Sequence, residues 1–309
     1  MCVKSSVKVA CVQAEPVVFD RDATLDKLAA LTAEAAGNGA ELVVFPETFV
    51  SVYPSSVWAK ALAGWGDPRA KAAFAQLADS AVEIPGPAAD RLGEIAKANS
   101  VWLVTGVNEL DPARNGTVFN TLLYNAHDGS LALKHRKLVP TNHERLVWGQ
   151  GDGGGLRAIE TPLGRIGGLI CWENYMPLAR FSLYESGVEI YLASTADDDD
   201  VWQATLVHIA RESRAFVVAP CHFQRSSAYP DDFPLRELLE GHDQIGRGGS
   251  AILAPDGSYL AGPLYGEEGT LYAELESTRL REERQRFDPA GHYHRPDILR
   301  LEVTPNQPV

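Results

Sequence analysis

Residues 167–180 read GGLICWENYMPLAR, and this stretch predicts the fold most clearly. An apolar, strand-like run ends at Cys171, and Trp172, Glu173 and Asn174 follow at once. Pro177, a residue favoured in the first turn of a helix, comes shortly afterwards. The stretch therefore predicts a strand, a short segment that carries a cysteine, and then a helix.

The same alternation of strand and helix runs along the rest of the chain. Asp-Gly pairs at 128–129 and 256–257 predict two hairpins. Apolar runs predict further strands at 7–13, 41–47, 101–107, 119–137, 188–194, 215–221 and 248–264, and capped or periodic stretches predict helices at 23–39, 86–100 and 201–214. We therefore expect one α/β domain with mixed sheets, formed by residues 1–275, and a tail of residues 276–309 at a subunit contact.

Composition limits the classes of function. The chain has 309 residues, of which 45% are apolar and 22% charged, and its formal net charge is -13. This charge argues against nucleic-acid binding, which needs clustered Lys and Arg. No apolar run reaches the length of a membrane helix, the start lacks the features of a secretory signal, and the four cysteines form no C-x-x-C pair. A cytoplasmic protein that binds no membrane is expected.

Three other motifs carry weaker signals. The acidic run ADDDD (196–200) lacks the alternating ligand spacing of a calcium loop, so we interpret it as the cap of the helix that follows. The two histidines of GHYHRPD (291–297) are not accompanied by a third residue that could complete a metal site. The glycine-rich GQGDGGG (149–155) follows no strand in the way that a phosphate loop requires. We therefore expect no metal site and no bound nucleotide.

Three polar residues end apolar runs, where open α/β sheets usually place their sites: Glu47, Lys137 and Cys171. A partly desolvated glutamate has a raised pKa and suits a general base. A lysine near a cysteine favours the nucleophilic thiolate and can stabilise negative charge. Each residue alone also fits a structural role: a buried cysteine, a solvated lysine or a capping glutamate.

The sequence motifs around these residues favour a catalytic role over a structural one. VVFPETF (43–49), HRKLVPTNHERLVWGQGDG (135–153) and GGLICWENYMPLAR, in that order, resemble the nitrilase branch of the nitrilase superfamily of carbon–nitrogen hydrolases. The resemblance extends from VKVACVQAEP near the start to residue 297. It implies a four-layer αββα sandwich that pairs into a homodimer or a larger homo-oligomer or filament. It also implies Glu47 as general base, Lys137 as charge stabiliser, Cys171 as nucleophile and Glu144 as an additional active-site carboxylate.

The implied reaction needs no cofactor. Cys171 attacks the nitrile carbon to give a thioimidate, with the proton supplied by Glu47 or Lys137. Water activated by Glu47 adds, ammonia leaves, and a second water releases the acid from the thioester. Lys137 and a backbone N–H near Trp172 hold the developing negative charge. The predicted pocket wall, which would suit an aryl or arylaceto nitrile, consists of Tyr53, Trp172, Thr195 and Trp202.

Alternatives of other classes stay open. A cyanide-degrading enzyme or an amide-directed hydrolase would share Glu47, Lys137 and Cys171, although Cys-Trp-Glu-Asn favours nitriles. A non-catalytic scaffold on the same fold would not need all three residues. A papain-like enzyme is disfavoured because its cysteine motif is absent. The sequence identifies neither the natural nitrile nor the ratio of acid to amide.

Overall fold

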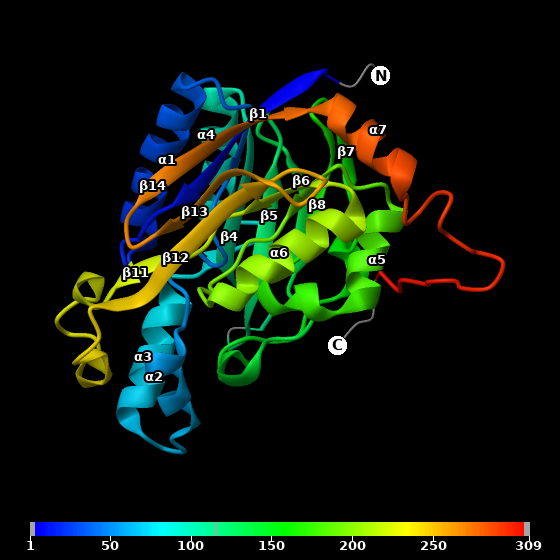
Figure 1. The fold of residues 1–309 in the computed structure, drawn as a ribbon. Coiled ribbons are helices and arrows are strands. Elements are labelled where there is room, and N and C mark those ends of the chain that lie inside the picture. Colours follow the sequence, from blue (N-terminus) through cyan, green and yellow to red (C-terminus); the bar gives the residue numbers. More distant parts are fainter. Residues whose placement is uncertain (1–3, 115, 306–309) are drawn as a thin grey trace.

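The computed structural model describes residues 4–114 and 116–305 of the chain. Within this part, the strands form two seven-stranded mixed sheets that lie face to face. Helices α1 and α4 cover the outer face of one sheet, and α5 and α6 cover the outer face of the other (Figure 1). The expected four-layer αββα sandwich is therefore confirmed.

The first sheet has the order β14-β1-β2-β4-β5-β6, and β3 pairs with β4. Its strands are β1 (Ser6–Gln13), β2 (Leu42–Val44), β3 (Val82–Glu83), β4 (Trp102–Leu110), β5 (Val118–Asn125), β6 (Leu131–Arg136) and β14 (Gly269–Glu276). Strands β1 and β14 pair antiparallel along their whole length, from Ser6 opposite Glu276 to Gln13 opposite Gly269. The two ends of the fold therefore meet in one sheet.

The second sheet has the order β11-β12-β10-β9-β8-β7, and β13 pairs with β12. Its strands are β7 (Ile159–Thr161), β8 (Gly164–Gly168), β9 (Ile190–Leu192), β10 (Phe216–Ala219), β11 (Phe223–Arg225), β12 (Gln244–Leu253) and β13 (Tyr259–Tyr265). The two predicted Asp-Gly hairpins are confirmed, because β5 is joined to β6 at Gly129 and β12 to β13 at Gly257. Both glycines have positive φ, 92° and 85°.

Helices form in the segments for which the sequence predicted them. The α-helices are α1 (Arg21–Gly37), α2 (Ser56–Ala59), α3 (Pro68–Asp79), α4 (Pro87–Asn99), α5 (Pro177–Glu185), α6 (Asp200–Ser213) and α7 (Ser277–Arg286). Short 3-10 turns are η1 (Lys60–Ala63), η2 (Asn142–Leu146), η3 (Gly153–Gly155), η4 (Cys171–Tyr175), η5 (Ser226–Ala228) and η6 (Arg236–Leu239). Asp199 caps α6 by accepting a hydrogen bond from Val201 N, so the predicted capping role of the acidic run is confirmed.

Three apolar layers hold the sandwich together. The central layer lies between the sheets and contains, among others, Val9, Leu122, Ile170 and Leu192. A second layer packs α1 and α4 on the first sheet, and a third packs α5 and α6 on the second. Because the middle of each sheet is buried on both faces, strands such as β2, β5, β9 and β10 are buried along their whole length.

Residues beyond 275 pack against the domain of the same protomer. Leu280 of α7 joins the central apolar layer, Glu283 accepts from Arg214 at 2.8 Å, and Arg284 donates to the Val188 carbonyl. Farther along, the ring of His294 lies 5.2 Å from that of Phe181 in α5. The boundary at residue 275 stays a prediction, as does the role of this tail at a subunit contact.

Candidate active site

Glu47 lies on the loop after β2, between the two sheets. The loop crosses close over β4, because Phe45 N bonds the Val104 carbonyl. A Cβ at Gly106 of β4 would come within 2.2 Å of the Pro46 carbonyl, so only glycine lets the loop lie there. The Glu47 side chain is fully buried.

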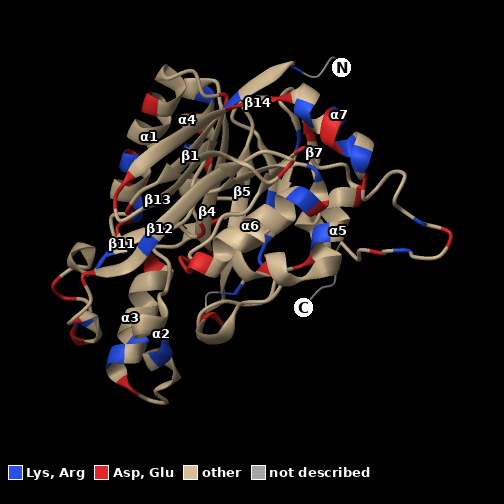
Figure 2. Cartoon of the chain, viewed as in Figure 1, with Lys and Arg blue, Asp and Glu red and all other residues tan. Residues whose placement is uncertain are grey.

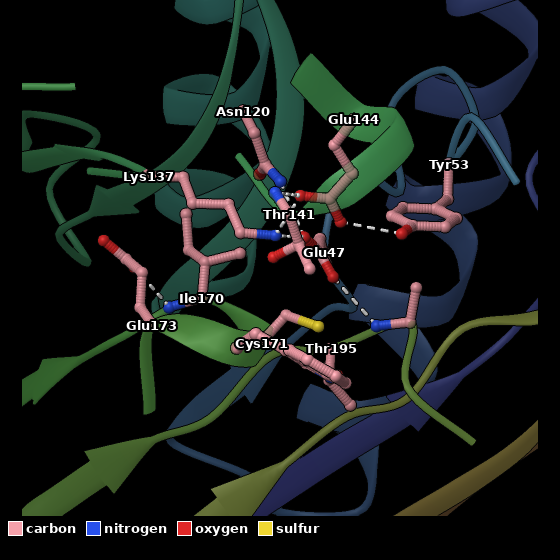
Figure 3. Close-up of polar contacts among 12 residues, drawn as sticks. Glu47, Tyr53, Asn120, Lys137, Thr141, Glu144, Ile170, Cys171, Glu173 and Thr195 are labelled. Atoms are coloured by element: carbon pink, nitrogen blue, oxygen red, sulfur yellow. Dashed lines mark hydrogen bonds and ion pairs between the residues drawn. The ribbon is translucent and has the colours of Figure 1, made fainter. Parts of the chain in front are cut away.

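Cys171 follows β8 and begins the turn η4. Its φ of 51° lies in the left-handed region, which residues other than glycine rarely adopt. Its N–H donates to the Ser194 carbonyl at 2.9 Å, which fixes the turn against the end of β9. Such a backbone position is typical of functional residues that the surrounding structure holds in place. In Figure 3 the Cys171 sulfur points toward the Glu47 carboxylate.

Lys137 follows β6 directly and lies between two carboxylates. Its Nζ donates to Glu47 Oε1 at 2.8 Å and to Glu144 Oε2 at 2.7 Å, and all three side chains are buried (Figure 3). Its backbone N–H donates to the Asn120 carbonyl of β5 at 2.8 Å. Three residues predicted from the sequence as catalytic therefore form one ion-pair cluster, and Cys171 faces it.

The cluster is held by further hydrogen bonds. Asn120 Nδ2 donates to Glu47 Oε1 at 2.6 Å, and Ala196 N donates to Glu47 Oε2 at 2.9 Å. Glu144 accepts from Tyr53 Oη at 2.7 Å and from Thr141 N at 2.6 Å. Glu144 thus orients Lys137 while its own carboxylate is fixed from the other side.

Burial dominates the electrostatics of the cluster. Desolvation raises the pKa of Glu47, and the charge of Lys137 opposes this shift without reversing it. Burial alone would lower the pKa of Lys137, but the charges of Glu47, Cys171 and Glu144 outweigh it and raise that pKa. Lys137 is therefore a permanent cation, whereas Glu47 is suited to exchange protons.

Lys137 lowers the pKa of the Cys171 thiol, as expected of a lysine near a cysteine, but larger effects oppose it. Burial and the Glu47 carboxylate raise the pKa of the Cys171 thiol well above its ordinary value, and the opposing effect of Lys137 is smaller. Burial is the largest cause, and the two carboxylates within 2.8 Å of Lys137 also compensate the lysine charge. Cys171 therefore needs a base to become the nucleophilic thiolate.

Glu173 is a positioning residue that the sequence did not single out. One of its oxygens accepts from Leu138 N and the other from Ile170 N, both at 2.7 Å, and His135 Nε2 lies 3.0 Å away. Burial would raise the pKa of Glu173, but His135 and the two backbone N–H groups outweigh it and lower that pKa. The carboxylate thus links the residue after Lys137 to the residue before Cys171.

A cavity of about 370 Å³ is lined in part by Cys171. Tyr53 and Trp172, two of the predicted wall residues, line it together with Cys171 and Glu144. Trp172 is 49% exposed, and its Nε1 donates to Asp197 at 2.7 Å. These two aromatic rings give the cavity an apolar side next to the sulfur.

The other two predicted wall residues lie elsewhere. Thr195 is fully buried beneath the cavity, where its hydrogen bond to Cys171 lowers the pKa of the thiol. Trp202 belongs to the apolar layer under α6 and does not line the cavity, so its assignment to the pocket wall is corrected to core packing. It supports the wall indirectly, since Tyr175 contacts both Trp202 and Trp172 through ring edges.

The sequence also missed Asn120, His222 and Gln224. Asn120 lies in the buried strand β5, Gln224 lies in β11 and His222 directly precedes β11. All three side chains are buried, and a buried polar group must find a partner. A polar residue at a position expected to be buried could have identified these three residues as candidates. The sequence could not show which of the three side chains faces the cavity.

The described part of the chain offers no ready site for several other ligands. It contains no group of three or more His, Cys, Asp or Glu side chains placed to hold a metal ion. Nor does any described helix combine the length and apolarity that a bilayer crossing needs. Figure 2 shows basic and acidic residues together on α1, α3 and α7 rather than separated onto different elements.

Comparison with known proteins agrees with this geometry. The carbon–nitrogen hydrolase family matches residues 8–285. The chain is 42% identical over 313 residues to the bifunctional nitrilase/nitrile hydratase NIT4A of Lupinus angustifolius, covering 98% of this chain and 88% of that protein. It is also 42% identical over 296 residues to an aliphatic nitrilase of Sinorhizobium fredii, covering 96% and 95%. Among solved structures, Nit3 of Saccharomyces cerevisiae, a member of branch 10 of the nitrilase superfamily, superposes with a TM-score of 0.73 at 23% identity and covers 94% of this chain and 97% of that one.

Proposed function

The chain belongs to the nitrilase branch of the carbon–nitrogen hydrolases, and from this membership we propose how it converts an organic nitrile to a carboxylic acid and ammonia. The observation that carries the proposal is the buried cluster of Glu47, Lys137 and Glu144 facing the Cys171 sulfur. A buried base and a fixed cation beside a nucleophile that lines the cavity are the groups that this hydrolysis requires.

In the first half of the reaction Glu47 takes the proton of the Cys171 thiol as the sulfur attacks the nitrile carbon. The same carboxyl group then gives this proton to the nitrogen, which yields a thioimidate. The pKa of Glu47, raised by burial, suits both steps. Lys137 stays charged and stabilises the negative charge that develops on nitrogen.

The second half consumes two water molecules. Glu47 activates the first water, which adds to the thioimidate carbon, and the tetrahedral intermediate expels ammonia to leave a thioester. A second water, activated in the same way, releases the carboxylic acid and returns the proton to sulfur. Glu144 keeps Lys137 in place throughout, since it holds Nζ at 2.7 Å and is itself fixed by Tyr53.

The substrate proposed is an aryl or arylaceto nitrile. The cavity of about 370 Å³ is far larger than cyanide requires and lies within the usual range for small organic ligands. The rings of Tyr53 and Trp172 next to the sulfur offer apolar surface to a substrate ring. Neither feature would favour cyanide.

A panel of nitriles tests both levels of this proposal. Ammonia release should be measured for phenylacetonitrile, benzonitrile, butyronitrile and cyanide, with acid and amide separated by chromatography because one relative is named for both activities. Loss of all turnover in a folded Cys171→Ala variant is expected. Efficient turnover of cyanide together with failure of both aromatic nitriles would refute the substrate class.

We also propose that the protein acts as a homodimer or a larger homo-oligomer. Leu178 of α5 is 68% exposed, and Tyr293 and Ile298 of the neighbouring tail are 63% and 65% exposed. Contact between Phe181 and His294 places α5 and the tail together, so these apolar side chains offer a surface to a second copy. Light scattering on the purified protein measures the mass, and a fully active monomer would contradict the proposal.

A further inference from the structure

Two buried polar groups on the cavity wall have no use in the proposed mechanism. They are His222 and Gln224, which are 3% and 2% exposed and both line the cavity. His222 Nε2 and Gln224 Oε1 have no hydrogen-bond partner within residues 4–114 and 116–305. Buried polar atoms normally find partners, because leaving one unpaired costs free energy. The two atoms therefore indicate a ligand with a polar group.

Local structure aims both side chains the same way. Gln224 belongs to β11 and His222 directly precedes this strand, so the two are separated by one residue in extended chain and share a face. Opposite Gln224 in the antiparallel ladder stands Gly246, which also lines the cavity. A Cβ at Gly246 would lie 3.1 Å from the His222 carbonyl oxygen, so glycine lets β12 pass close to this segment.

This pair lies close to the catalytic cluster. The backbone N–H of His222 donates to the Thr195 carbonyl at 2.9 Å, and Thr195 contacts Cys171. The ring of His222 lies 6.1 Å from that of Tyr53, whose hydroxyl binds Glu144. A substrate bound for attack by Cys171 would therefore lie close to both residues.

The charges of His222 and Gln224 indicate which kind of polar ligand group they can bind. Burial lowers the pKa of His222 from 6.5 to about 4, so its imidazole is neutral near pH 7, and the Gln224 amide carries no charge. The acidic groups of the cavity are engaged, because Asp197 accepts from Trp172 and Asp198 from the backbone N–H of Arg247. A charged substituent against the neutral pair would lose its hydration without compensation.

We propose that His222 and Gln224 form a hydroxyl-binding subsite, and that the enzyme prefers nitriles bearing a neutral hydroxyl group. A hydroxyl donates one hydrogen bond and accepts two, so it can donate to Gln224 Oε1 and accept from His222. This inference rests on the proposed nitrile hydrolysis and adds the chemistry that selects among nitriles.

Isosteric substrate pairs test the proposal in the wild-type enzyme. The kcat/KM of ortho-, meta- and para-hydroxyphenylacetonitrile is compared with that of the methyl twins, and 3-hydroxypropionitrile is compared with butyronitrile. At least one hydroxyl compound should exceed its twin by roughly fivefold or more, the gain expected from a hydrogen bond to a neutral partner. If every pair differs by less, or if amino-substituted compounds are preferred instead, the subsite is refuted. Failure of all nitriles would instead refute the proposed function.

A matched pair of variants locates the preference. Gln224→Met keeps the length of the side chain and removes the amide, so the hydroxyl-to-methyl ratio should fall to near one. Gln244→Met makes the same change at an exposed position on β12 that does not line the cavity, and it should keep the wild-type ratio. An unchanged ratio in folded Gln224→Met overturns the assignment. If that variant does not fold, the wild-type substrate pairs decide the question.

Discussion

Replacing Glu173 by glutamine should destabilise the protein and displace its catalytic groups. The two carboxylate oxygens face different donors, Leu138 N on one side and Ile170 N on the other, both at 2.7 Å. An amide has only one oxygen, so its NH₂ group must point at one of these two N–H groups. One buried donor then loses its partner, and the remaining bonds lose their charge assistance. We expect a loss of about 3–5 kcal/mol in the free energy of unfolding.

The same change should reduce turnover per folded molecule. Ile170 immediately precedes Cys171, and Leu138 immediately follows Lys137, so release of either N–H moves a reacting group. A displacement of about 1 Å can cost roughly 10²-fold in rate, and we expect kcat to fall by that order with KM little changed. A purely structural role would lower the amount of folded protein but leave the kcat of the folded fraction intact.

Urea unfolding and ammonia-release kinetics, measured together, provide the test. The control is Glu160→Gln in β7, since the side chain of Glu160 is 81% exposed and only pairs with Arg165 at 3.0 Å. It should change stability by less than about 0.5 kcal/mol. If Glu173→Gln matches this control in both stability and kcat, the positioning role is refuted.

Acid adds a second readout for Glu173. Its pKa is lowered in the folded protein, so its contribution to stability is full above the unfolded value of 4.5 and is lost as pH falls through the folded value. The Gln variant should lack this part of the acid sensitivity. Equal acid sensitivity of the two proteins would contradict the assigned charge.

Three further predictions follow from the site and the tail. Glu47→Gln and Lys137→Ala should each lower kcat by about 10³-fold in ammonia-release assays, because each removes a charge that the transition states use; an active Glu47→Gln enzyme would point to another base. Because burial lowers the pKa of His222 from 6.5 to about 4, the wild type should lose ~3 kcal/mol of stability as pH falls between these values, a loss that urea titrations should not find in His222→Gln. Deleting residues 286–309 should lower both the oligomer mass measured by light scattering and the activity. An unchanged oligomer with unchanged activity would show that the tail has no role in oligomerisation.

Much of the ion-pair cluster could be predicted because Glu47, Lys137 and Cys171 each follow an apolar run. The strands before them are not neighbours, since β4 and β5 separate β2 from β6 and β8 belongs to the other sheet. The surrounding motifs therefore had to indicate that the three residues belong together. The sequence could not predict the direction of the pKa shift of the Cys171 thiol, because that shift depends on how deeply the sulfur is buried and on the carboxylates around Lys137.

The supporting residues were harder to predict for the same reason. The contacts that give Glu173 its role join segments 35 residues apart, and no local pattern reports them. Trp202 shows the converse, since a periodic apolar stripe on a helix identifies a buried face but does not tell core from cavity. Local signals thus placed the elements, whereas the assignment of each buried side chain required the packed structure.

The pairing of β1 with β14 has a consequence for how the cell makes this protein. A ribosome releases β1 first, but its antiparallel partner at 269–276 emerges only after almost the whole polypeptide has been translated. At ordinary elongation rates, β1 waits roughly ten to fifty seconds with one side unpaired. An open strand edge is a template for association between nascent chains. Yield on heterologous expression should therefore depend on growth temperature and on chaperone supply, even for variants whose mature stability is unaltered.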